Sequence, residues 1–122
     1  VPSGPWYSSN SASVSDLIKS VQRIKEINPR MIIPSHRRIQ TKNIPAQLDR
    51  YIGVVIERNE RLLDILAQPH TLDQLAEYHL VFPDCQNIYE LFWEKMTLRN
   101  HLRHLMQEGL VHQIPGELYQ RT

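Results

Sequence analysis

The fold is decided largely by one stretch of the sequence, Met31-Ile32-Ile33-Pro34-Ser35-His36-Arg37-Arg38. The apolar run 31–33 is typical of a short buried strand, and it ends directly in Pro-Ser-His. A strand holds a side chain more rigidly than a free loop does, and neutral imidazole is the commonest protein ligand for transition metals. His36 is therefore a candidate metal ligand. Because zinc takes three or four protein ligands, the others would have to come from outside this chain.

Length and composition favour one small domain, or a small domain with an appendage. The chain has 122 residues, of which 41% are hydrophobic and only 4 are glycine, which argues against a turn-rich all-β fold. The net charge of +1 provides no field that would draw the whole chain to nucleic acid or to a membrane. The single cysteine, Cys85, excludes an internal disulfide and fits a reducing compartment, so we expect a cytoplasmic protein.

The start of the chain and its longest apolar runs bear on its context. No run approaches the roughly 18 apolar residues of a membrane span. The first residues, Val1-Pro2-Ser3-Gly4, contain neither an initiator methionine nor a signal-peptide pattern, so we expect a truncated piece of a longer protein.

A helix is predicted over residues 13–28, where apolar residues recur at spacings of three and four. They form one stripe on the helix: Val14, Leu17, Ile18, Val21, Ile24 and Ile27. Ser13 or Ser15 offers an N-cap, and Pro29 ends the helix because the residue before proline is pushed out of the helical region. A helix followed by the strand 31–33 is the second half of an α/β crossover. Three elements cannot form a sheet core alone, so we expect residues 1–40 to have packed on a part of the protein outside this chain.

A second helix is predicted from residue 44 to about 67, with Asn43 as its N-cap and Pro45 in the first turn. Its apolar side consists of Leu48, Tyr51, Ile52, Val55, Leu62, Leu63 and Leu66. We expect residues 41–70 to form a linking helix.

Residues 71–122 have the order of elements of a winged helix. Thr71 caps a short helix, and a long helix over about 87–108 carries the apolar stripe Ile88, Leu91, Leu98, Leu102 and Leu105. Gly109 stands where a helix C-terminus favours glycine, and two short strands flank Pro115-Gly116. The sequence thus predicts a mainly α protein with a small β component (α+β): an α-β unit, a linking helix and a winged-helix-like domain.

Taken together, these segments resemble the C-terminal part of metallo-β-lactamase-fold hydrolases that carry a winged-helix extension. The matching segments are Gly4-Pro5-Trp6-Tyr7, the helix 13–28, Ile33-Pro34-Ser35-His36, Tyr51-Ile52, residues 58–66 and residues 98–111. In that family the last α-β unit of an αββα sandwich ends in a Pro-Gly-His-Gly-like loop, and its histidine binds one of two zinc ions. The resemblance implies that His36 is this ligand and that the intact parent is a two-zinc hydrolase.

The chain departs from the family pattern at several positions. Ser35 and Arg37 replace the glycines on either side of the histidine, and Glu57-Arg58 stands where relatives often carry His-Arg. The remaining family ligands belong to a His-x-His-x-Asp-His motif and later positions upstream, which this sequence lacks. We therefore expect these residues alone to bind no zinc tightly and to be inactive, and the partner to be an upstream catalytic domain of the same chain.

Several cationic residues are candidates for contact with a substrate or with nucleic acid. Arg37 and Arg38 follow the predicted strand and could meet an anionic substrate. Lys95, Arg99 and Arg103 recur every four residues, as on the recognition helix of a nucleic-acid-binding module, and so the alternative function is a winged-helix DNA- or RNA-binding regulator. Glu90, Glu94 and Glu108 oppose this reading, and we favour a winged helix that packs on the catalytic domain or shapes its substrate cleft.

Two further expectations concern the surface of the chain. His101 and His104 lie on the same long helix, where surface polarity explains them as well as metal chelation does. Without the upstream domain, some apolar surface would be exposed, and a homo-oligomer is then possible.

Overall fold

The computed structural model describes residues 5–35 and 38–122. Within these residues the elements are α1 (Val14–Ile27), α2 (Ile44–Ile65), α3 (Leu72–Ala76), α4 (Ile88–Gln107), β1 (Val111–Ile114) and β2 (Leu118–Arg121). The strands pair antiparallel, with Val111 opposite Arg121 and Ile114 opposite Leu118. The protein is therefore mainly helical with a small two-stranded sheet, which confirms the predicted class.

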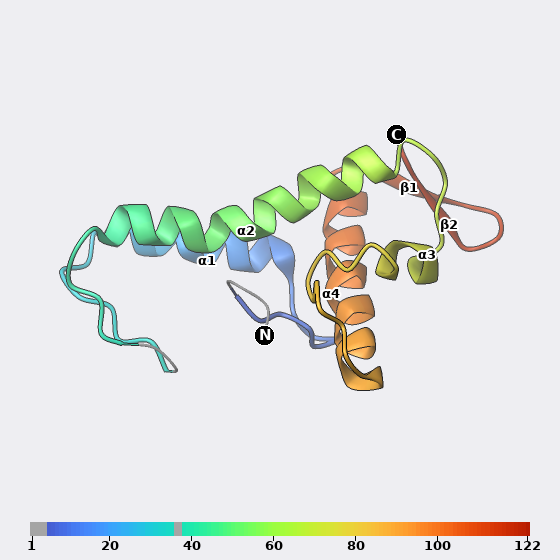
Figure 1. Cartoon of the computed structure of the whole chain (residues 1–122). Coiled ribbons are helices and arrows are strands. Elements are labelled where there is room, and N and C mark those ends of the chain that lie inside the picture. The colour runs from blue at the N-terminus through green and yellow to red at the C-terminus, as the bar shows by residue number, and fades with distance from the viewer. Residues whose placement is uncertain (1–4, 36–37) are drawn as a thin grey trace.

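Figure 1 shows how these elements are arranged: α1 and α2 lie side by side in opposite directions, and α4 runs away from one end of this pair. The hairpin β1–β2 lies at the C-terminal end of α4. At the other end of the pair, the connection between α1 and α2 projects from the body (Figure 1). We call its described residues, 29–35 and 38–42, the arm.

The helix ends follow from local chemistry. The side chain of Ser13 accepts a hydrogen bond from the Asp16 amide at 3.1 Å and so caps α1. At the end of α4, Gly109 has φ +73°, a conformation that L side chains rarely adopt. The Gly109 and Leu110 amides donate to the carbonyls of Met106 (3.1 Å) and Leu105 (2.9 Å), which is the Schellman arrangement. The sequence prediction for Gly109 is confirmed.

Two apolar clusters make up the core, and α2 contributes to both. One joins the first half of α2 to α1 and consists of Tyr7, Val14, Val21, Ile44, Leu48, Ile52 and Val55. The other joins the end of α2 to α3, α4 and the hairpin, and consists of Leu62, Leu66, Leu75, Ala76, Leu80, Val81, Phe82, Leu98, Leu102, Leu105 and Val111. On α2 the buried Arg58 lies between the two sets.

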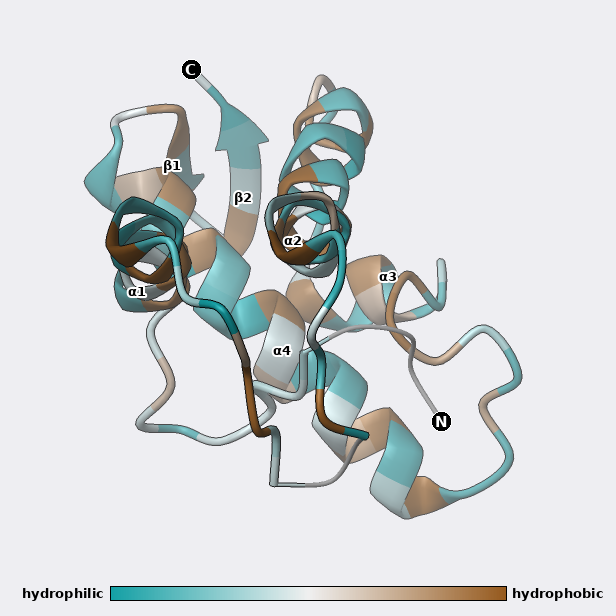
Figure 2. Ribbon diagram, turned by 90° about the vertical axis from the view of Figure 1, so that its left-hand side faces the viewer, coloured by the Kyte–Doolittle hydropathy of each residue, from teal (hydrophilic) through white to brown (hydrophobic). Residues whose placement is uncertain are grey.

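The predicted buried strand 31–33 is wrong. In its place Ile32 forms a single bridge with Gln40, each amide donating to the other's carbonyl at 2.9 Å. Met31 and Ile33 remain 51% and 72% exposed. An apolar strand is buried only when a sheet extends beside it, and the described part of the chain provides no such sheet. Figure 2 shows the resulting hydrophobic stretches of the arm, below the ends of α1 and α2.

The predicted apolar stripes are buried only in part. In α1, Val14 and Val21 are buried, but Ile24 and Ile27 are exposed. In α4, Leu98, Leu102 and Leu105 are buried while Ile88 is exposed. In both helices the exposed residues lie toward one end, the C-terminal end of α1 and the N-terminal end of α4. No helix among the described residues combines the length and the apolar character needed to cross a lipid bilayer.

Candidate functional site

The predicted metal ligand, His36, stands between the two described parts of the arm in the sequence. His36 and Arg37 fall outside the described residues, so their predicted roles stay predictions. Arg38 is exposed, and its carbonyl accepts a hydrogen bond from the Gln40 side chain at 2.9 Å.

The three predicted cations of α4 differ in their surroundings. The Lys95 ammonium lies 2.9 Å from the carboxylate of Asp73 on α3. Arg99 and Arg103 are exposed. The structure therefore places two members of the predicted stripe in contact with solvent and ties the third to a neighbouring helix.

The neighbouring polar residues of α4 are not on the surface, which corrects the reading of His101 as a surface histidine. His101 and Asn100 are 0% and 3% exposed. They face the segment 5–9, which packs across α4. A recognition helix would present such side chains outward, so neither residue is available to read a nucleic acid.

His101 lies in a hydrogen-bonded chain that joins α2, α4 and the N-terminal segment. Arg58 Nη1 donates to the hydroxyl of Tyr7 at 2.8 Å, and this hydroxyl lies 2.6 Å from His101 Nε2. A guanidinium group can only donate hydrogen bonds, so the Tyr7 hydroxyl accepts from Arg58. The hydroxyl can then donate its own proton to His101 Nε2, which accepts the hydrogen bond. His101 Nδ1 then carries the ring proton and donates to Asn59 Oδ1 at 2.7 Å. The network thus selects one neutral tautomer.

Further polar contacts fix the N-terminal segment and α1 on α4. The side-chain amide of Asn100 donates hydrogen bonds to the backbone carbonyls of Tyr7 (2.8 Å) and Ser9 (2.9 Å). The Ser8 and Thr97 hydroxyls are 2.6 Å apart. Ser15 at the start of α1 lies 2.6 Å from His104 Nδ1. Buried polar groups are costly unless paired, so these contacts specify one position of the segment.

Burial controls the ionisation of this network. It lowers the pKa of His101 to about 3, and the nearby charges of Arg58 and His104 act in the same direction. Burial also raises the pKa of Tyr7, although the Arg58 guanidinium opposes this. Both side chains are therefore neutral at ordinary pH, and Arg58 is the cation of the network.

Glu94 is a second buried ionisable group on α4. Its carboxylate accepts from the Val81 amide, with distances of 3.0 and 3.2 Å to the two oxygens. Burial raises the pKa of Glu94, while the Val81 amide, His79 and Arg58 partly offset the shift. His79 has a buried Nδ1 atom with no hydrogen-bond partner among the residues that the structure describes.

The sequence contains a signal for two of these residues, Glu94 and His101. Leu91, Glu94, Leu98, His101 and Leu105 follow one another at alternating spacings of three and four. This is the pattern of a single buried helix face, on which a glutamate and a histidine occupy apolar positions. Polar residues at such positions indicate a buried network.

A groove of about 510 Å³ lies between α1, α2 and the arm. Its walls are mostly apolar and include Val21, Ile24, Ile32 and Leu48, with Arg50 among the polar residues. The groove adjoins the exposed apolar residues of the arm. An unfilled apolar surface of this kind is where a further part of a protein could pack.

The described residues do not by themselves fit a zinc site. Among residues 5–35 and 38–122, no group of three or more His, Cys, Asp or Glu side chains could hold a metal ion. His101 and His104 bind neighbouring side chains and do not converge on a common point as ligands would. We therefore derive no reaction step through zinc from these residues.

Comparison with known proteins does not assign the chain to a family. No protein-family model and no curated protein matches it. A proposal of function therefore depends on the residues and their arrangement.

Proposed function

We propose that these residues form the C-terminal portion of a zinc-dependent hydrolase of the metallo-β-lactamase superfamily. In this proposal the arm and α1 belong to the last α-β unit of its αββα sandwich, and α2 is the linking helix. The region from α3 to β2 is a winged helix that packs on the catalytic domain or shapes its substrate cleft.

The exposed apolar surface of the arm is the observation that carries the proposal. Met31, Ile33 and Ile39 are exposed on both sides of Pro34-Ser35-His36 in the sequence. Contiguous apolar surface of this kind marks a site of interaction. A sheet that covered it would bury the arm and would bring its own side chains toward His36, as a metal site with ligands from elsewhere requires.

The order and contacts of the C-terminal elements support the winged helix. The hairpin follows α4 directly, and His70, before α3, forms an antiparallel bridge with Tyr119 of β2. Backbone pairing between the hairpin and the segment before α3 joins α3, α4 and the hairpin in one unit. The unit is stabilised by the larger of the two apolar clusters.

The test is to read the gene upstream of Val1 and to express the extended chain with zinc. We expect a His-x-His-x-Asp-His motif upstream and bound zinc by elemental analysis. We also expect hydrolysis of at least one of three kinds of probe: a thioester, a lactam and a phosphodiester. His36→Ala should lose metal and activity together. His112→Ala, which removes an exposed histidine of β1, is the matched control and should keep both. An H36A protein that retains all its zinc would contradict the proposal.

The exposed Arg99 and Arg103 favour one alternative, a winged-helix module that binds nucleic acid. In that case this chain alone should bind duplex DNA or RNA, with an affinity that falls steeply as salt rises. The double variant Arg99→Ala, Arg103→Ala should weaken binding, whereas His36→Ala should not.

A further inference from the structure

A second exposed apolar surface lies at the N-terminal end of α4, away from the arm. It consists of Trp6, Ile88, Tyr89, Phe92 and Trp93, whose exposures range from 36% to 75%. We call it the aromatic patch. Surface aromatic residues are common singly, but five large apolar side chains in one place call for a partner.

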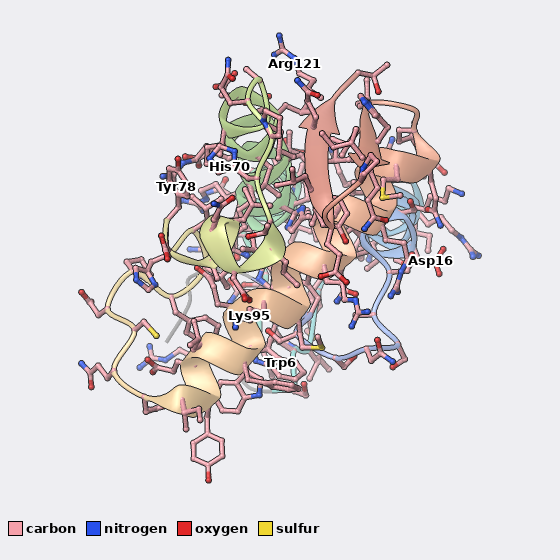
Figure 3. All side chains as sticks on the ribbon, turned by 90° about the vertical axis from the view of Figure 1, so that its right-hand side faces the viewer. Trp6, Asp16, His70, Tyr78, Lys95 and Arg121 are labelled. Atoms are coloured by element: carbon pink, nitrogen blue, oxygen red, sulfur yellow. The ribbon has the colours of Figure 1, made fainter. Side chains whose placement is uncertain are left out.

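The patch is contiguous. Residues three and four apart on a helix are neighbours, so Ile88 and Tyr89 adjoin Phe92 and Trp93. The rings of Trp6 and Trp93 meet edge to face, with their centroids 6.5 Å apart, and the buried Phe82 lies 6.1 Å from Trp93. Figure 3 shows Trp6 beside the N-terminal half of α4, at the opposite end of the molecule from Arg121.

The fold holds this surface in place. Tyr7, Ser8 and Ser9 are fixed on α4 by the buried hydrogen bonds described above, and this determines the position of Trp6, the preceding residue. Phe82 supports Trp93 from the apolar core. A rigid aromatic surface loses little conformational entropy when it binds, which is a property of interaction surfaces.

The side chains that define the patch are all aliphatic or aromatic. The carboxylate of Glu90, which lies within the same turns of α4, accepts from the Gln86 amide at 2.8 Å and so faces the preceding link. Lys95, at the next turn, is paired with Asp73. A partner surface therefore needs no complementary charge. A neutral patch can face its own copy without bringing like charges together.

The area of the patch indicates how strong such an association can be. With side-chain areas of about 150–250 Å² each, the four partly exposed aromatic residues present roughly 450 Å². With the exposed Ile88 added, two such patches would remove about 1,000 Å² from water in total, which is at the lower limit for specific complexes. This area suits a reversible dimer.

We propose that the aromatic patch is a homodimer interface, which joins two copies of this chain about a two-fold axis. A two-fold axis brings the same patch of each copy together, so exposed ring edges in one copy can meet ring faces in the other. The interface is distinct from the arm, and it does not depend on the chain being part of a hydrolase.

Sedimentation equilibrium of the 122-residue chain over a range of concentrations tests the interface. The patch variant Ile88→Gln, Phe92→Gln should raise the dimer dissociation constant at least tenfold, because central apolar residues dominate interface energies. The matched control is Ile56→Gln, Met106→Gln, which changes two exposed apolar residues of α2 and α4 outside the patch and should leave the constant unchanged. Tyr89→Gln provides an independent substitution, and circular dichroism verifies that each variant is folded.

Tryptophan fluorescence supplies a second readout that is specific for this surface. The chain has only two tryptophans, and Trp6 and Trp93 are both in the patch. We expect the emission maximum of the unmodified chain to move to shorter wavelength as concentration rises, and that of the patch variant to stay constant. A chain that remains monomeric overturns the proposal. So does a dimer that the control variant disrupts and the patch variant does not.

Discussion

His101 is a neutral hydrogen-bonding link in the core and not a proton carrier at ordinary pH. Its Nε2 accepts from Tyr7 and its Nδ1 donates to Asn59, so both ring nitrogens are used without a positive charge. Protonation would place a second cation near Arg58 in a buried environment. This is the physical reason for its low pKa.

Stability should therefore fall in mild acid. The pKa of His101 is lowered from 6.5 to about 3, so the unfolded chain binds the proton more tightly than the folded one. The contribution of His101 is complete above pH 6.5 and is lost as the pH falls toward 3. From pH 7 to pH 5 we expect a loss of about 2 kcal/mol in the free energy of unfolding.

Urea unfolding at pH 5, 6 and 7 measures this loss. His101→Gln should be less stable than the parent at pH 7 but should show a much smaller decrease between pH 7 and 5. His112→Gln, which changes an exposed histidine, should keep the decrease of the parent. An H101Q protein with the full decrease would show that another group is responsible.

Glu94 should have the opposite pH dependence. Because burial raises its pKa, its contribution is complete below the unfolded value of 4.5 and is lost as the pH rises through the folded pKa. We expect Glu94→Gln, which keeps an acceptor for the Val81 amide, to match or exceed the parent in stability at pH 7 and to lose this advantage near pH 4. Glu94→Leu removes the acceptor and should cost about 1–3 kcal/mol. Equal losses for both variants at pH 7 would contradict this account.

At the scale of the elements, substitution of two glycines by alanine should change the stability in opposite directions. One glycine lies within a helix and the other follows the end of one. Gly53 lies within α2, and a Cβ atom added there would meet nothing within 4 Å. Gly53→Ala should therefore raise the free energy of unfolding by about 1 kcal/mol. Gly109→Ala should lower it by about 1 kcal/mol, because Gly109 has φ +73° at the end of α4. Thermal and urea unfolding of the single variants and of the double variant check both values, which should add.

The helices and the hairpin could be predicted from the sequence because their signals are local. The spacing of apolar residues, Ser13 and Thr71 as caps, and Gly109 located the elements to within a few residues. The strand 31–33 could not be settled in this way, since an apolar run forms a buried strand only if other strands lie beside it. Its single bridge to Gln40 is what the described chain can form alone.

The candidate site was less accessible to sequence reasoning. Tyr7 and His101 are 94 positions apart, and nothing in their spacing predicts that one hydrogen-bonds to the other. The burial of Asn100 and His101 depends on the segment 5–9 packing on α4, which is a long-range event. One amphipathic stripe per helix was too simple a description, because α4 is covered on two sides. The predicted role of His36 remains a prediction.

At the scale of the whole molecule, the buried polar network lies between the two apolar clusters. Arg58 and Asn59 occupy the turn of α2 between Val55 of one cluster and Leu62 of the other. The larger cluster includes the end of α2 and most of α4, whereas the arm is attached to the body through α1 and α2 and has one bridge of its own. Local stability should therefore differ along the chain.

Hydrogen exchange should report this difference. We expect the amides of residues 98–105 to exchange only through opening with a free energy close to that of global unfolding. The amides of the arm should exchange fastest, apart from those of Ile32 and Gln40, which are hydrogen-bonded to each other's carbonyls. Mass spectrometry or NMR of the exchanging chain provides the rates. Comparable protection in the arm and in α4 would contradict this description.

The attachment of the last residues has a practical consequence for binding experiments. The amides of Arg121 and Thr122 donate to the carbonyls of Leu66 (2.8 Å) and Leu110 (2.9 Å), so the chain is held to the body up to its final residue. Figure 1 places this end away from both the arm and the N-terminal end of α4. A tag added after Thr122 would therefore tether the molecule to a biosensor chip with both apolar surfaces facing the flowing solution. Random coupling through lysines would not, because one of them, Lys42, belongs to the arm itself.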